Sequence, residues 1–115
     1  MKKLFTTAVV VLFAIFAQAQ SQYDQGMNKA FELWKTGNTT DAAAMFERIA
    51  SVEKNNWLPN YYVALVNTTA AFQVLKDKEK VSALLDKAQQ NLDIEFAKNP
   101  QNPEILVLQA LIYTA

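Results

Sequence analysis

The sequence predicts an all-α protein, and three observations support this fold class. Only two glycines and three prolines interrupt the 115 residues, whereas alanine, leucine, lysine, glutamine and glutamate, which favour helices, are plentiful. Apolar residues recur every three or four positions, and no stretch shows the strict alternation of apolar and polar residues that is typical of a strand. About half of the chain is apolar (51%), a composition that suits one globular domain or a short repeat array.

The N-terminal segment has the three parts of a secretory signal peptide. Two lysines follow the initiating methionine, an almost unbroken apolar run covers Leu4–Phe16, and Ala17 and Ala19 place small residues where a signal peptidase cleaves. A helix of about 13 residues is about 20 Å long, which is shorter than a hydrocarbon core of about 30 Å. We therefore predict that residues 1–19 are a cleavable signal peptide, with an uncleaved anchor as the alternative.

Cleavage after Ala19 would leave Gln20 as the first residue of the mature chain. The signal has a bacterial pattern, and no cysteine follows the apolar run as a site for acylation. We therefore expect an exported protein of the periplasm or the cell exterior, with no stable membrane anchor after signal cleavage.

Five helical segments follow, and the first runs from about Gln22 to Lys35. Apolar side chains form one stripe of this helix and polar side chains the other, as in an amphipathic helix at the surface of a core. The stripe contains Tyr23, Met27, Ala30 and Trp34. Gly37 follows as the expected C-terminal cap, because glycine adopts the left-handed conformation that ends many helices.

The second and third helices are predicted over about residues 40–53 and 59–75. Thr40 or Asp41 can cap the second helix with a side-chain oxygen, and Pro59 is tolerated in the first turn of the third. Apolar residues at helical spacing identify the buried faces. They are Ala42, Met45, Phe46 and Ile49 in the second helix and Tyr62, Leu65, Val66, Ala70 and Phe72 in the third.

The fourth helix is predicted over about residues 79–98 and the fifth from residue 103 onward. Pro100 ends the fourth helix because its ring disfavours continued helix, and Glu104 lies in the first turn of the fifth, where the helix dipole favours an acid. The fifth helix is apolar on nearly every face, so it needs neighbours on more than one side. The apolar positions are Val81, Leu84, Leu85, Ala88, Leu92 and Phe96, then Ile105, Leu106, Leu108, Leu111, Ile112 and Tyr113.

The connections between these segments are only about three to five residues long. Such short connections force successive helices to lie antiparallel, so we expect stacked helix pairs. Small residues recur where large ones might be expected, and small residues let helix axes approach closely. These residues are Ala30, Ala42, Ala88 and Ala110.

The stretch from Trp34 to Phe46 resembles the middle of a tetratricopeptide repeat. In that family a glycine and a polar residue form the turn between paired helices, an alanine follows about five residues later, and an aromatic residue lies one turn beyond it. Gly37, Asn38, Ala42 and Phe46 match these positions.

Two further stretches extend this resemblance toward the C-terminus. The matching residues are Ala88, Leu92 and Pro100 for the second half of a following repeat and Leu106, Ala110 and Tyr113 for the opening helix of a third. About 46 residues separate Ala42 from Ala88, against a family period of about 34, so longer helices are expected in the second pair. The resemblance implies an α-solenoid of about two and a half repeats over residues 20–115, packed together by Ala30, Gly37, Ala42, Phe46, Ala88, Leu92 and Ala110.

Composition excludes several classes of function. Eleven basic and eleven acidic residues cancel, and without a basic stripe we expect neither nucleic acid nor anionic lipid as a partner. The sequence contains no cysteine and no histidine, which excludes disulfides, thiolate or imidazole catalysis and the usual zinc ligands. We therefore predict a non-catalytic protein that uses no cofactor or metal.

The resemblance also implies where a partner would bind. In tetratricopeptide arrays the first helix of each pair lines the concave face, which here would offer Phe31, Lys35, Val63 and Asn67 to a peptide. Core packing is the competing interpretation for aromatic residues, because they bury a large apolar area. The function that this pattern favours is an interaction scaffold that holds a peptide or helix of another protein.

The apolar fifth helix provides an alternative. An exposed apolar helix at the end of an array needs a partner, and the sequence stops at Ala115 without a polar capping helix, so we expect a fragment of a longer protein. Dimerisation through Leu108, Leu111 and Ile112 would also cover such a face. The alternative function is therefore that of a self-assembling structural homo-oligomer.

Overall fold

The computed structural model describes residues 20–115, and these residues form five helices without a strand. The N-terminal helix covers residues 20–35. It is followed by α2 (Thr39–Val52), α3 (Leu58–Gln73), α4 (Lys78–Lys98) and α5 (Pro103–Thr114). These bounds lie within about two residues of the predicted ones, and the predicted all-α class is confirmed, because helical periodicity and turn residues act locally. The predicted signal peptide lies outside the described residues.

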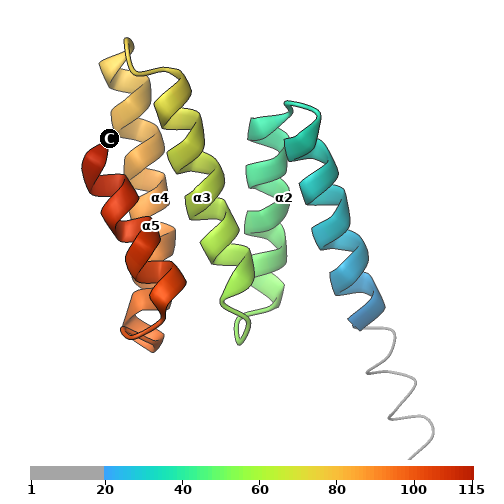
Figure 1. The fold of residues 1–115 in the computed structure, drawn as a ribbon. Helices are drawn as coiled ribbons and strands as arrows, with labels where there is room; N and C mark the ends of the chain where they lie inside the picture. The colour runs from blue at the N-terminus through green and yellow to red at the C-terminus, as the bar shows by residue number, and fades with distance from the viewer. Residues whose placement is uncertain (1–19) are drawn as a thin grey trace, which may run out of the picture.

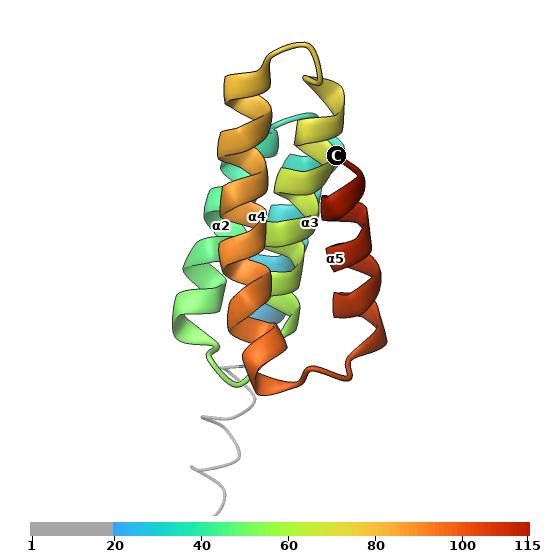
Figure 2. The ribbon, with the colours of Figure 1, turned by 90° about the vertical axis from the view of Figure 1, so that its left-hand side faces the viewer.

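The helices form two layers joined by tight turns (Figures 1 and 2). Successive helices run antiparallel, as the short connections predicted. Figure 2 shows α2 and α4 on one side of α3, with α5 on the other. The central helix α3 packs against α2 and α4, and α5 contacts both α3 and α4. Among residues 20–115 no helix has the length and hydropathy needed to cross a membrane.

Helix α3 occupies the centre because it buries residues around most of its circumference. Pro59, Val63, Ala64, Val66, Asn67, Thr68 and Ala71 are its buried residues. The two polar ones are accommodated by the helix itself: the Thr68 Oγ1 donates to the Ala64 carbonyl at 2.7 Å, and the Asn67 Nδ2 donates to the Val63 carbonyl at 2.8 Å. Such bonds to the preceding turn remove the cost of burying an unpaired donor.

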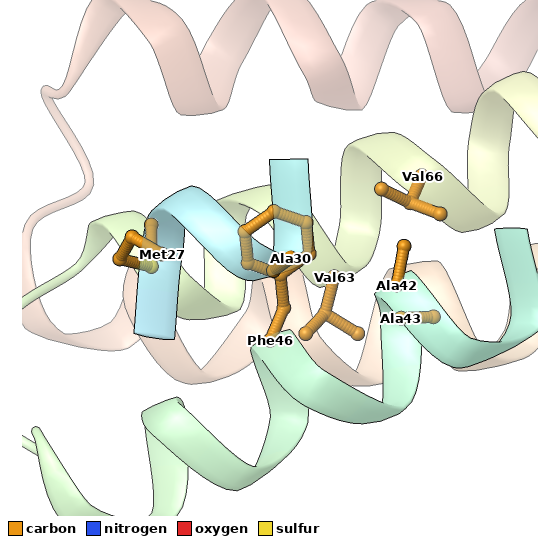
Figure 3. Close-up of a cluster of buried hydrophobic side chains, with 7 residues drawn as sticks. All are labelled: Met27, Ala30, Ala42, Ala43, Phe46, Val63 and Val66. Atoms are coloured by element: carbon orange, nitrogen blue, oxygen red, sulfur yellow. The ribbon is translucent and has the colours of Figure 1, made fainter. Parts of the chain in front are cut away.

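The N-terminal core lies between the N-terminal helix, α2 and one side of α3 (Figure 3). It consists of Met27, Ala30, Ala42, Ala43, Phe46, Val63 and Val66. Three rings meet in it: the Phe31 and Phe46 centroids are 5.2 Å apart edge to face, and the Tyr62 ring lies 4.8 Å from Phe31 and 5.4 Å from Phe46. Ala30 and Ala42 are fully buried where the two helices of the pair meet, as expected of small packing residues.

The C-terminal core lies between the other side of α3, α4 and α5, and it is aliphatic. It consists of Ala64, Ala88, Leu92, Ile105, Leu108 and Ile112. Ala88 and Leu92 are fully buried, as the sequence predicted for packing residues. Ala110 is exposed instead, because α5 turns Ile105, Leu108 and Ile112 toward α3 and α4 and leaves Ala110 on the opposite face.

The turn at Gly37 has the conformation that the sequence predicted. Gly37 has φ of 88°, in the left-handed region that favours glycine. Its N–H donates to the Trp34 carbonyl at 3.1 Å, and the Asn38 N–H donates to the Leu33 carbonyl at 2.8 Å. These two bonds form a Schellman motif, which satisfies carbonyls at the end of the N-terminal helix.

The expected cap of α2 is wrong. The N-cap residue is Asn38, and its side chain makes no capping bond. Its Nδ2 donates to the Thr36 Oγ1 at 3.2 Å. Thr40 and Asp41 lie inside the first turn instead. By contrast, α4 and α5 have side-chain caps. The Lys80 N–H donates to the Asp77 carboxylate, and the Glu104 N–H donates to the Asn102 amide oxygen.

Candidate binding groove

A groove runs between α2 and α4, with α3 as its floor. Its volume is about 450 Å³, which lies within the range of small-ligand sites. We call it the α2–α4 groove, and its lining residues are Thr39, Thr40, Ala43, Asn67, Ala70, Gln73, Val74, Lys80, Ala83, Leu84 and Lys87. The groove exists because alanines face it from all three helices at Ala43, Ala70 and Ala83. A larger side chain at any of these positions would fill the space.

An ion pair closes one end of the groove. The Lys87 Nζ on α4 lies 2.7 Å from the Glu47 Oε1 on α2, and this contact bridges the two walls. Beyond it, a second hollow of about 350 Å³ continues between the same helices toward Ser51 and Lys98. The lining of the second hollow includes Asn60 and Asn91. The α2–α4 groove is therefore a bounded site whose open end lies toward the start of α2.

The charged groups of the groove lining are both cationic. Lys80 and Lys87 contribute to the lining, and no acidic residue does. Glu47 holds Lys87 at the closed end, whereas Lys80 is 3.8 Å from the Asp77 carboxylate with both side chains largely exposed. Because exposed pairs at this distance are weak, Lys80 is the lysine available to a ligand.

The open end of the groove contains backbone donors. Thr39 and Thr40 occupy the first turn of α2, and no acceptor within residues 20–115 pairs with the N–H groups of Thr39, Thr40 or Asp41. The first turn of a helix leaves such donors free and carries a partial positive charge. Two carboxylates lie close to these groups, because Asp41 is in the same first turn of α2 and the Asp77 carboxylate is 3.8 Å from the Lys80 Nζ, so this end of the groove contains charges of both signs.

Asn67 supplies the buried polar group of the floor. Its side chain is 4% exposed, and its Nδ2 is engaged with the Val63 carbonyl. Its Oδ1 accepts no hydrogen bond from residues 20–115.

The four predicted binding residues do not gather on one surface. Asn67 lines the α2–α4 groove, and Lys35 is exposed at the end of the N-terminal helix. Phe31 packs its ring against Phe46, and Val63 is fully buried in the N-terminal core. Val63 and Asn67 are four residues apart and lie on the same side of α3. Packing of α2 and α4 against that side places Val63 in the N-terminal core and Asn67 in the groove.

Sequence reasoning did not identify Lys80, Ala83 and Lys87 as groove residues. Their spacing of three and four positions places them along one side of α4, which was a detectable signal. Their alignment against Thr40 and Ala43 of α2 depends on packing around α3, and no local pattern encodes it.

The residues of α5 that the sequence predicted for dimerisation are not on its exposed face. Leu108 and Ile112 are 2% and 8% exposed in the C-terminal core, and Leu111 is half-buried against it. The outward surface, which we call the α5 strip, consists of Leu106, Val107, Ala110 and Tyr113. Val107 is 66% exposed and Tyr113 80% exposed.

In the described part of the chain, residues 20–115, two tyrosines have shifted pKa values. Burial raises the pKa of Tyr23 at the N-terminal core, and burial followed by the Glu104 carboxylate raises the pKa of Tyr61 beside the C-terminal core. Neither tyrosine lines the α2–α4 groove. Within residues 20–115, no cluster of three or more acids is arranged to hold a metal ion.

Comparison of the chain with models of known families, with curated proteins and with solved structures finds no match.

Proposed function

We propose that this protein is an exported, non-catalytic interaction scaffold that binds an extended segment of another protein in the α2–α4 groove. The observation that carries the proposal is the groove itself, a largely apolar site of about 450 Å³ formed by three helices from two successive pairs. Apolar grooves between packed helices are a recurring recognition mode for peptide segments. Signal cleavage after Ala19 would deliver the scaffold to the periplasm or the cell surface.

Packing features expected of tetratricopeptide-like helix pairs support the proposal. Ala30 and Ala42 are fully buried in the first pair, Gly37 turns the chain between its helices, and Ala88 is fully buried in the second pair. The longer α4, at 21 residues, accounts for the wide spacing of the two pairs along the sequence. We extend the proposal to a short solenoid that binds its partner between α2 and α4, the second helices of the two pairs, and not on the first helices that the resemblance implied.

Filling the groove tests this proposal directly. A photo-crosslinking residue at the exposed Thr40 reports on a bound partner in the cell envelope, and Ala83→Trp fills the groove from the exposed side of α4. We expect one discrete crosslinked partner in the parent background and its loss with Ala83→Trp. Ala97→Trp is the matched control, because Ala97 is exposed on the same helix but outside the groove.

Both tryptophan variants must stay folded for this comparison. Circular dichroism should show the same helix content for both tryptophan variants, because both positions are exposed. A crosslinked partner that survives Ala83→Trp as well as it survives Ala97→Trp would exclude the groove as the binding site.

The α5 strip favours self-assembly as a second candidate function. Val107 and Tyr113 expose large apolar surfaces on one face of α5, and a second copy of the chain could bury them across a twofold axis. In that case light scattering should give a dimer mass for the parent and a monomer mass for Val107→Lys. Val52→Lys, at a comparably exposed valine on α2, should keep the dimer. A monomer at all concentrations would exclude this candidate.

A further inference from the structure

The first residue of the proposed mature chain carries two groups that can react with each other. Cleavage after Ala19 leaves Gln20 with a free α-amino group and a side-chain amide. Attack of the amine on the amide carbon closes a lactam ring of low strain, and the two groups are held close together because they belong to one residue. An asparagine at this position would have to close a smaller and strongly strained ring, so the reaction is specific to the length of the glutamine side chain.

The structure leaves this end of the mature chain accessible. Gln20, Ser21 and Gln22 are exposed at the start of the described helix, and Tyr23 is the first residue that packs against the N-terminal core. The first turn of a helix lacks part of its hydrogen bonds and frays at little cost. The Gln20 side chain can therefore turn back onto its own α-amino group without disturbing the core.

The helix also favours the reactive form of the amine. Residues 20–35 are helical, so the α-amino group of the mature chain would lie at the N-terminal end of this helix. That end carries a partial positive charge, which disfavours an added ammonium group. The neutral amine is the nucleophile of the cyclisation, and the lactam nitrogen of the product carries no charge. Cyclisation therefore removes an unfavourable charge from the end of the helix.

We propose that Gln20 of the mature chain is a modification site, at which the α-amino group and the side-chain amide condense to a pyroglutamyl residue. The α-nitrogen forms a bond to Cδ, and the bond from Cδ to the side-chain nitrogen breaks. That nitrogen leaves as ammonia and takes one proton from the attacking amine. The reaction consumes no oxidant, reductant or second substrate. This inference rests on the proposed export and on cleavage after Ala19, and it adds the chemical state of the new N-terminus.

The lactam ring protects the residues that precede the core. Aminopeptidases bind a free α-amino group, and exposed chain ends are preferred sites of proteolysis. An unmodified chain therefore offers Gln20, Ser21 and Gln22 to stepwise removal, which would leave Tyr23 as the first residue of the helix. A pyroglutamyl residue has no free amine, so we expect the mature protein to keep its first turn.

Mass spectrometry of the N-terminal peptide tests the proposal on the protein recovered from the cells that naturally produce it. Amines are dimethylated on the intact protein before digestion, because a dimethylated Gln20 cannot cyclise during handling. Trypsin then releases residues 20–48, since dimethylated lysines resist cleavage and Arg48 is the only arginine of the sequence. We expect a peptide that carries no label on its first residue and is lighter than the unmodified sequence by one ammonia.

Two variants produced in the same cells control for the chemistry. Gln20→Asn keeps an amide but cannot close an unstrained ring, so its first residue should carry the dimethyl label in full. Gln22→Asn makes the same change at a nearby exposed position and should leave the pyroglutamyl residue in place. A broad-specificity aminopeptidase should trim Gln20→Asn and leave the parent and Gln22→Asn intact.

The outcomes separate this inference from the proposed function. A dimethylated Gln20 in the parent would overturn the modification and leave the cleavage site in place. A first residue other than Gln20 would overturn the modification together with cleavage after Ala19. A pyroglutamyl parent that is trimmed as fast as Gln20→Asn would overturn the protective role. None of these results changes the crosslinking readout at Thr40, which tests the α2–α4 groove separately.

Discussion

The N-terminal and C-terminal cores share α3 but differ in what fills them. The N-terminal core centres on aromatic rings, with Phe46 stacked on Tyr62 at 5.4 Å. The C-terminal core centres on the aliphatic side chains Leu92 and Leu108. Rings present rigid faces that constrain their neighbours, whereas aliphatic chains adjust through rotamers. We therefore expect the first helix pair to tolerate changes in the shape of its core side chains less well than the second.

At the C-terminal core the rings of Trp57 and Tyr61 pack only at the edge, and hydrogen bonds between side chains also join its helices. Gln89 on α4 and Gln109 on α5 exchange hydrogen bonds at 2.7 and 2.8 Å. Asn60 on α3 donates to the buried Glu95 carboxylate at 2.8 Å. These contacts fix the register of α3, α4 and α5, because an unpaired amide or carboxylate at such positions would be unfavourable.

Truncation of the two central side chains should give the largest effects. Phe46→Ala should lower the free energy of unfolding by about 4 kcal/mol and Leu92→Ala by about 3 kcal/mol, because each removes a fully buried side chain and leaves a cavity. Urea unfolding followed by circular dichroism measures both. Val52→Ala should change the value by less than about 0.5 kcal/mol, because Val52 is 76% exposed.

The same measurement shows whether the cores are coupled. Because α3 contributes Val63 to one core and Ala64 to the other, we expect a single transition for the parent and both variants. Two separate transitions, with Phe46→Ala moving only the first, would contradict the view that α3 joins the two cores into one unit.

Enlargement of the packing alanines should give the next largest effects. Ala42→Leu and Ala88→Leu insert bulk at fully buried positions, and overpacking costs about 1 to 3 kcal/mol. The cost at Ala42 should be the larger one, because the rings around Phe46 cannot move aside as the leucines around Ala88 can. Thermal unfolding of both variants gives the order, and a larger loss for Ala88→Leu would contradict the contrast between rigid and adaptable cores.

The two glycines should respond in opposite directions. Gly37→Ala should destabilise the protein by about 1 kcal/mol, since φ of 88° is unfavourable for alanine although no atom lies within 4 Å of the added Cβ. Gly26→Ala should stabilise the N-terminal helix by less than about 1 kcal/mol, because a gain in helix propensity is offset by contact with the Ile49 Cδ1 at 3.2 Å. Denaturation midpoints compare the two, and a loss of stability at Gly26 equal to that at Gly37 would contradict the role of backbone conformation.

The pH dependence of stability should show the smallest effect. Burial, and then Glu104, raises the pKa of Tyr61 above 10.0 in the folded protein, so the unfolded chain loses this proton at a lower pH. The contribution of Tyr61 to the free energy of unfolding is fully present below about pH 10. It is lost as the pH rises through the pKa that Tyr61 has in the folded protein. Alkaline unfolding followed by tyrosinate absorbance should therefore shift to higher pH with Tyr61→Phe. An unchanged alkaline midpoint would contradict the role of this tyrosine.

Local sequence information determined the secondary structure of this protein. Gly37 and Pro100 mark helix ends because their backbones disfavour continued helix in any tertiary context. The stripe through Met27 and Ala30 identified the buried face of the N-terminal helix, because residues three or four positions apart lie on one side of a helix. The all-α class and all five helices could therefore be predicted.

Tertiary packing decided the buried face of α5 and the composition of the groove. The fifth helix is apolar all round, so its sequence could not distinguish Leu108, which is buried, from Val107, which is exposed. Lys80 and the first turn of α2 line the same groove because both α2 and α4 pack against α3, and this packing depends on contacts between residues distant in the sequence.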